Sequence, residues 1–113
     1  MKNLRNSVQL IGHLGKDPEI KTFGSGKKLT SFSIATSETY KNQNGEKVED
    51  TQWHNIVMWG KVAEIAAKYL KKGEEVCVHG RIVHRNYEAD NGEKRYITEI
   101  NANDMLMLSK KEK

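Results

Sequence analysis

Residues 51–61 read Thr-Gln-Trp-His-Asn-Ile-Val-Met-Trp-Gly-Lys and hold both tryptophans of a chain whose other aromatics are four tyrosines and two phenylalanines. If this stretch is a strand, successive side chains point to opposite faces. One face would carry Trp53, Asn55, Val57 and Trp59. The other would carry His54, Ile56 and Met58. Because a buried face is usually aliphatic throughout, the tryptophan side is predicted to be an exposed surface on which flat rings can stack.

The composition indicates one small domain with a modest core. The chain has 113 residues, of which 36% are hydrophobic and 30% are charged. Its net charge of +4 is compatible with a polyanionic partner but does not establish one. The single cysteine, Cys77, excludes an intramolecular disulfide and fits a reducing compartment. No apolar run is long enough for a membrane span or a signal peptide, so we expect a cytoplasmic protein without membrane contact.

The chain before residues 51–61 has the pattern of strands joined by turns. Extended segments are expected over residues 6–14, 19–23 and 29–40. Gly12 lies inside the first of them, which suggests a bend or a close backbone approach, as at the corner of a barrel. Asn44 and Gly45 form the strongest short-range hairpin signal and predict that the third segment turns back into residues 51–61.

The chain after residue 60 changes its hydrophobic period. Apolar residues recur at helical spacing, at Val62, Ile65, Ala66 and Tyr69. A helix is therefore predicted over residues 61–72, with lysines in its last turn and Gly73 after its end. Two further strands are expected over residues 75–87 and 95–108, joined by a hairpin at Asn91-Gly92.

Apart from the short extended piece at 19–23, these elements predict an all-β protein with three strands, one helix and two more strands, and the strands are expected to be long and antiparallel. Five strands with a helix between the third and the fourth are typical of the OB-fold, a five-stranded Greek-key barrel. Residues 1–108 are predicted to form this domain, and residues 109–113 are predicted to be a charged C-terminal end. Such a barrel binds oligonucleotides on one curved face.

Catalytic and metal sites have little support in the sequence. His79 and His84 are five residues apart and would face opposite sides of a strand. Cys77 and His79 would share a face, but two ligands are fewer than a zinc site needs. We find no carboxylate pair, nucleophile motif or phosphate-binding loop. We therefore expect no metal, no cofactor and no enzymatic activity.

Aromatic and basic residues alternate with polar ones in a pattern that suits single-stranded nucleic acid. The candidate stacking rings are Tyr40, Trp53, Trp59 and Tyr87. Basic residues near them in sequence are Lys41, Lys61, Arg81 and Arg85. Rings can stack on unpaired bases, and cations can neutralise phosphates. Stacking is favoured for both tryptophans and is as plausible as packing for Tyr40 and Tyr87, whereas core packing is favoured for Phe32, Tyr69 and Tyr96.

Several strings of residues resemble the OB domain of the bacterial single-stranded DNA-binding protein family. They are Asn-x-Val-x-Leu-Ile-Gly-His-Leu-Gly-Lys-Asp-Pro-Glu at 6–19, Ala-Thr-Ser-Glu-Thr-Tyr at 35–40, residues 51–61 as quoted above, Ala-Glu-Ile-Ala-x-Lys-Tyr-Leu-Lys-Lys-Gly at 63–73, and Val-x-Gly-Arg-Ile at 78–82. The resemblance covers nearly all of the chain. It implies a homotetramer that binds single-stranded DNA without sequence preference in replication, recombination and repair.

The resemblance also implies roles for individual residues. The family's stacking aromatics fall on Tyr40, Trp53, Trp59 and Tyr87. Its basic positions fall on Lys21, Lys61, Lys71, Lys72 and Arg85, and the strand pattern adds Arg81 as a further phosphate contact. His54 matches a family histidine near the subunit interface, which agrees with its place on the face opposite the tryptophans. Asn55 and Val83 stand where some members carry arginine.

Two other kinds of function remain open from the sequence. An OB domain of this type could be an accessory or adaptor protein of replication restart, or an RNA chaperone. A nuclease on the same barrel would need clustered carboxylates and a metal.

Family members usually continue into a flexible linker and an acidic tip that recruits replication and repair proteins. The sequence to Lys113 shows no such segment, so contacts with those proteins are possible but not implied.

Overall fold

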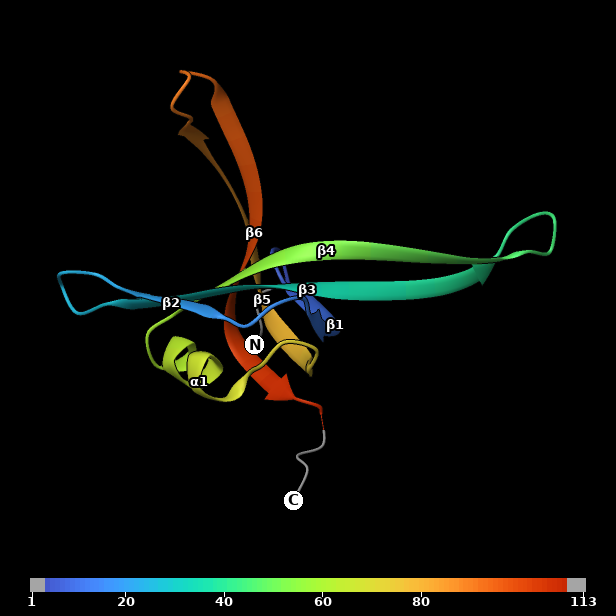
Figure 1. Ribbon diagram of the computed structural model, residues 1–113, viewed down its shortest axis with the longest axis horizontal. Coiled ribbons are helices and arrows are strands. Elements are labelled where there is room, and N and C mark those ends of the chain that lie inside the picture. The colour runs from blue at the N-terminus through green and yellow to red at the C-terminus, as the bar shows by residue number, and fades with distance from the viewer. Residues whose placement is uncertain (1–3, 110–113) are drawn as a thin grey trace.

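The computed structural model describes residues 4–109 as a barrel from which two long hairpins project (Figure 1). The elements in chain order are β1 (Val8–Leu14), β2 (Glu19–Thr22), β3 (Lys28–Lys41), β4 (Lys47–Trp59), α1 (Lys61–Tyr69), β5 (Glu75–Glu88) and β6 (Lys94–Met107). Within residues 4–109 this order confirms the all-β prediction and the single helix after the third long strand. Most of the predicted charged end, residues 110–113, lies outside the described residues.

The sheet closes on itself to form the predicted OB-type barrel. Its strand order is β1-β5-β6-β4-β3-β2, and an additional β1–β3 pairing joins the two ends of the barrel. The short strand β2 pairs with β3 and extends the sheet at that edge. One pairing differs from the antiparallel arrangement that the sequence suggested, because β4 runs parallel to β6. In the sequence, α1 and β5 come after β4 and before β6. After these two elements, β6 runs in the same direction as β4.

The inward faces of the strands form one hydrophobic core. Its members are Leu14, Phe32, Ile34, Ile56, Met58, Val76, Val78, Ile100 and Ala102, together with Ala63, Ala66 and Leu70 from the helical segment. The helix covers one end of the barrel, where the hydroxyl of Thr30 donates a buried hydrogen bond of 2.7 Å to the carbonyl oxygen of Ala63. Burying these apolar side chains is the main favourable contribution to folding.

The helix ends three residues earlier than its sequence pattern predicts. Tyr69 is its last residue, and Leu70 takes an extended conformation with φ −85° and ψ 143°. Leu70 is only 2% exposed, so the chain leaves the helical path where this side chain enters the core. Gly73, with φ 87°, then turns the chain into β5, in a conformation that favours glycine.

Two glycines allow strands to pass very close to each other inside the barrel. A Cβ atom on Gly12 would collide with the carbonyl oxygen of Ala35, and a Cβ atom on Gly80 would collide with that of Asn101. The β5–β6 register shifts between His79 and Gly80, where β6 carries an extra residue. The close backbone approach predicted at Gly12 is therefore confirmed, and Gly80 makes a second one that the sequence pattern did not identify.

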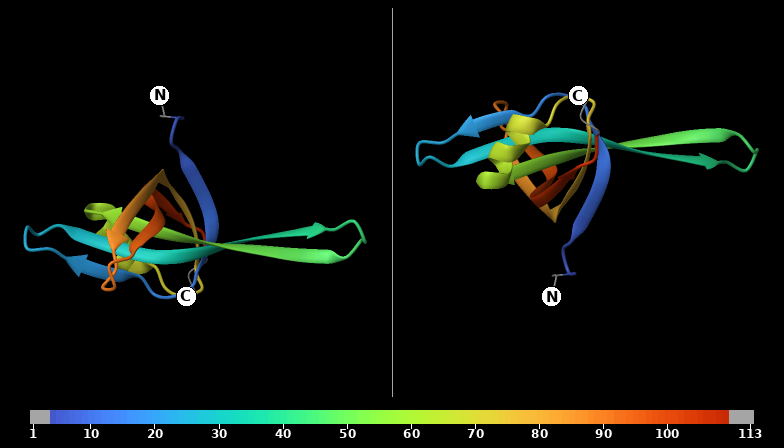
Figure 2. Two further views of the ribbon diagram at one scale, coloured as in Figure 1. Left: turned by 90° about the horizontal axis from the view of Figure 1, so that it is seen from above. Right: turned by 90° about the horizontal axis from the view of Figure 1, so that it is seen from below.

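Both hairpins turn where Asn-Gly pairs predicted them. Gly45 and Gly92 have φ values of 78° and 84°. Beyond the barrel the β3–β4 hairpin continues as a projecting arm (Figure 2). The side chains of this arm are mostly exposed. No helix among residues 4–109 is long and apolar enough to cross a membrane.

Candidate nucleic-acid interface

Strand β4 has the two faces that its alternating pattern predicts. Ile56 and Met58 are fully buried in the core, and His54 on the same side is half-buried. Trp53 and Trp59 on the other side are 61% and 44% exposed. Because neither ring belongs to the core, stacking partners can reach both of them.

The strand register joins the tryptophan side of β4 to neighbouring strands. Trp59 pairs with Leu29 of β3, and Leu29 pairs with Lys21 of β2. On the other side of β4, two cross-strand rows reach β6 and then β5. They are Asn55–Glu99–Val83 and Val57–Asn101–Arg81. Since paired residues point to the same side of a sheet, these side chains form one continuous surface. We call it the tryptophan face, and it comprises Lys21, Phe23, Leu29, Trp53, Asn55, Val57, Trp59, Arg81, Val83, Arg85, Tyr87, Glu99 and Asn101.

Both tryptophan rings of the tryptophan face pack against a neighbouring residue. Trp59 stacks on Phe23, with ring centroids 5.7 Å apart and an angle of 24° between the planes. Phe23 follows β2 and is a ring that the sequence pattern did not single out. The Trp53 ring lies against Gly15, where an added Cβ atom would come within 2.5 Å of ring carbon Cζ3. Tyr87, 49% exposed, continues this surface along the β5–β6 hairpin.

Three other aromatic side chains test the sequence-based predictions. Phe32 is buried in the core, as predicted. The predictions of core packing for Tyr69 and Tyr96 are wrong, because these rings are 41% and 77% exposed. Tyr69 lies on the outer side of α1, where Lys68 Nζ is 5.3 Å from its ring centroid. Tyr96 lies on the β5–β6 hairpin, which extends beyond the barrel (Figure 1).

Tyr40 is exposed but does not lie on the tryptophan face. It pairs with Val48 near the end of the β3–β4 arm. In this register it falls on the same hairpin side as Ile34 and His54, which pair with each other. Any DNA that contacts both Tyr40 and Trp53 must therefore pass around the arm.

The predicted basic residues fall into separate groups. Lys21, Arg81 and Arg85 lie on the tryptophan face. Lys61 begins α1 and lines a hollow beside Trp59 that also includes Lys27 and Lys28. Lys71 and Lys72 lie on the exposed loop after the helix, where the Lys72 backbone N–H donates to Asp17 Oδ1 at 2.8 Å.

The hollow beside Trp59 contains a short ion pair. Lys28 Nζ lies 2.8 Å from Glu64 Oε1. The hydrogen bond from Lys28 and its positive charge lower the pKa of the Glu64 carboxyl group. Glu64 therefore stays ionised at neutral pH and reduces the positive charge on this side of Trp59.

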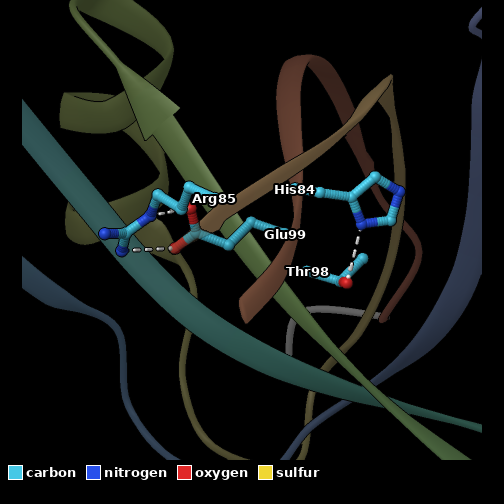
Figure 3. Close-up of polar contacts among 4 residues, drawn as sticks. All are labelled: His84, Arg85, Thr98 and Glu99. Carbon is cyan, nitrogen blue, oxygen red and sulfur yellow. Dashed lines mark hydrogen bonds and ion pairs between the residues drawn. The ribbon is translucent and has the colours of Figure 1, made fainter. Parts of the chain in front are cut away.

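Arg85 is engaged within the protein. Its Nε and Nη2 atoms donate to Glu99 Oε1 and Oε2 at 2.8 and 3.1 Å. This hydrogen-bonded pair raises the pKa of Arg85 further above its already high value. Figure 3 shows the pair on one side of the β5–β6 hairpin, whereas His84 and Thr98 contact each other on the other side.

His54 lies where the sequence pattern places an interface residue, on the side of β4 opposite the tryptophans. Its Nε2 atom is 2.9 Å from the hydroxyl oxygen of Thr36, which fixes the ring against β3. Among residues 4–109 we find no cluster of three or more histidine, cysteine or acidic side chains that could hold a metal ion.

Comparison with known proteins connects this geometry to a family. Residues 5–108 match the model of the single-strand binding protein family. Single-stranded DNA-binding protein 1 of Chlorobaculum tepidum is 47% identical over 108 residues, which cover 95% of this chain and 67% of that protein. A single-stranded DNA-binding protein of Neisseria meningitidis is 50% identical over 103 residues, which cover 91% of this chain. The chain spans only 59% of that relative's length.

Solved structures give the same result for the fold. A Plasmodium falciparum single-strand binding protein, solved with single-stranded DNA, superposes with a TM-score of 0.87 and 33% identity, covering 96% of this chain and 99% of that one. A deletion mutant of the single-stranded DNA-binding protein of Thermus aquaticus gives a TM-score of 0.81 at 28% identity, covering 92% and 50%. The chain therefore belongs to the single-strand binding protein family.

Proposed function

We propose that this protein binds single-stranded DNA without sequence preference on its tryptophan face. The observation that carries the proposal is the exposure of Trp53 and Trp59 on one continuous surface with basic side chains beside them. The family match and the names of the relatives support it. The Plasmodium structure, solved with single-stranded DNA, supports it further.

The proposed contacts are of two kinds. Bases stack on Trp53, Trp59 and Tyr87, since every base has a π-face and stacking needs no particular sequence. Phosphates are neutralised by basic side chains near the rings, for which we propose Lys21, Lys61 and Arg81. Tyr40, Lys71 and Lys72 are proposed as outlying contacts, reached only if the strand wraps around the protein.

The proposal is tested by titrating the protein with poly(dT) and following tryptophan fluorescence. We expect quenching, because bound bases would stack on the tryptophan rings. We also expect the affinity to fall as salt rises, by about 0.7 log units per tenfold increase in salt for each phosphate neutralised. Absence of quenching at low salt would refute the proposal. Stronger binding of RNA in direct competition would favour an RNA chaperone instead.

We further propose that the protein acts as a homotetramer that protects single strands in replication, recombination and repair at the chromosome. Family membership supports the assembly. The positions of Tyr40 and His54, on the side of the β3–β4 hairpin opposite Trp53, are also compatible with a second subunit or a wrapped strand on that side. Family members are binding proteins and not enzymes, so we propose no reaction.

The assembly can be tested at His54. Replacing His54 with alanine removes its hydrogen bond to Thr36 and is expected to shift the protein to a smaller species in sedimentation velocity. Trp53→Ala, one residue away on the opposite face, is the matched control and should leave the sedimenting mass unchanged. A wild-type protein that sediments as a monomer would contradict the tetramer, and an unchanged His54→Ala variant would contradict the role of His54.

A further inference from the structure

Glu99 is a nearly buried carboxylate in the middle of the tryptophan face. It is only 8% exposed and pairs with Asn55 of β4 on one side and Val83 of β5 on the other. A negative charge is unexpected on a surface that meets phosphates. A carboxylate this buried also needs a partner, because leaving it unpaired would be costly.

Arg85 is that partner, and the geometry of the pair is close to ideal. Two N–H groups of the guanidinium meet the two carboxylate oxygens in the parallel arrangement that makes arginine–carboxylate pairs strong and specific (Figure 3). A phosphate that took Arg85 from Glu99 would leave a buried carboxylate uncompensated. It would also have to lie beside that negative charge.

Arg81 provides an internal comparison. It lies on the same strand and the same face, four residues before Arg85, and it is exposed. Within residues 4–109 Arg81 has no ion pair, whereas Arg85 has the bidentate one. Two arginines on one surface therefore differ in the charge that they offer to a ligand.

We propose that Glu99 neutralises the charge of Arg85, so that Arg85 holds the buried Glu99 carboxylate in place and does not bind a phosphate of the DNA. This inference rests on the proposed single-stranded DNA binding. The phosphates then follow Arg81 on β5 and Lys21 on β2, which are the two outermost strands of the tryptophan face. The hollow of about 390 Å³ between Trp59, Val57 and Val83, which the pair also lines, is left to a base, because its walls are mostly apolar and its charges cancel.

The salt dependence of binding to a dT oligonucleotide tests this assignment. The plot of log affinity against log salt loses about 0.7 from its slope for each phosphate contact removed. The double variant Arg85→Gln, Glu99→Gln replaces the pair with two neutral amides and is expected to keep the wild-type slope. The matched control Arg81→Gln is expected to reduce the slope by about 0.7.

The single variant Glu99→Gln should have the opposite effect. It frees the charge of Arg85, so we expect a slope about 0.7 steeper than the wild type. The variant should also bind more tightly than the wild type at low salt. The ratio of the two affinities should then fall about fivefold for each tenfold rise in salt. A Glu99→Gln slope equal to that of the wild type would contradict the inference.

Two outcomes separate this inference from the function on which it rests. If the wild type does not bind the oligonucleotide, the proposed function fails. If the wild type binds but the salt slope of the double variant falls by as much as that of Arg81→Gln, then Arg85 does contact a phosphate and the inference is overturned. Should the variants fail to fold, the wild type still decides by NMR: the nuclear Overhauser contacts between the Arg85 Nε–H proton and the side-chain protons of Glu99 should persist when the oligonucleotide binds, and their loss would contradict the inference.

Discussion

Replacing Trp59 with alanine is expected to weaken binding to single-stranded DNA by about 5- to 150-fold, since a stacked base contributes about 1–3 kcal/mol. Trp53→Ala should have an effect in the same range. The loss should be larger at Trp59, because that ring also holds Phe23 in a stacked pair. The measurement is fluorescence polarisation of a labelled dT oligonucleotide at constant salt.

Two controls distinguish lost stacking from lost structure. Trp59→Phe keeps a flat ring at the same position and should retain most of the affinity. Tyr96→Ala removes a ring that is 77% exposed but lies on the other side of the β5–β6 hairpin from Tyr87, so it should bind like the wild type. Because neither tryptophan belongs to the core, thermal unfolding should change little. Equal affinities for Trp59→Ala and the wild type would show that the tryptophan face is not the binding surface.

The faces of β4 could be predicted because a strand has a period of two. Ile56 and Met58 alternate with Trp53 and Trp59, and this alternation alone separates the core from the exposed surface. The hairpins were predicted for a similarly local reason, since Asn-Gly specifies its turn through the backbone conformation of two residues. Features that depend on a few neighbouring residues could therefore be predicted from the sequence.

The internal partners of the binding surface were not predictable in this way. The Arg85–Glu99 pair depends on the β5–β6 register, and the contact of Phe23 with Trp59 depends on the pairing of β2 with β3. Tyr40 has an exposed ring, as expected, but its side of the hairpin follows from the register with Val48. A register slip of one residue would reverse every such assignment.

Gly80→Val is expected to cause the largest loss of stability of any substitution considered. A Cβ atom there would collide with the Asn101 carbonyl group and the Ala102 Cα atom. These are backbone atoms that cannot rotate away. Overpacking usually costs about 1–3 kcal/mol, and we expect more here, out of a total stability of roughly 5–15 kcal/mol. Urea and thermal unfolding would measure the change, and a melting temperature that falls by less than about 12 °C would contradict the expectation.

Gly24→Val is the matched control, because Gly24 lies on an exposed loop, has no positive φ, and has no neighbouring atom within 4 Å of the place that an added Cβ atom would take. Its stability should match that of the wild type. Gly80 also adjoins the register shift between β5 and β6, directly before Arg81. A Gly80→Val protein that still folds must therefore move β5 away from β6, which would separate Arg85 from Glu99. Such a variant should bind DNA with an altered salt dependence, whereas Gly24→Val should bind like the wild type.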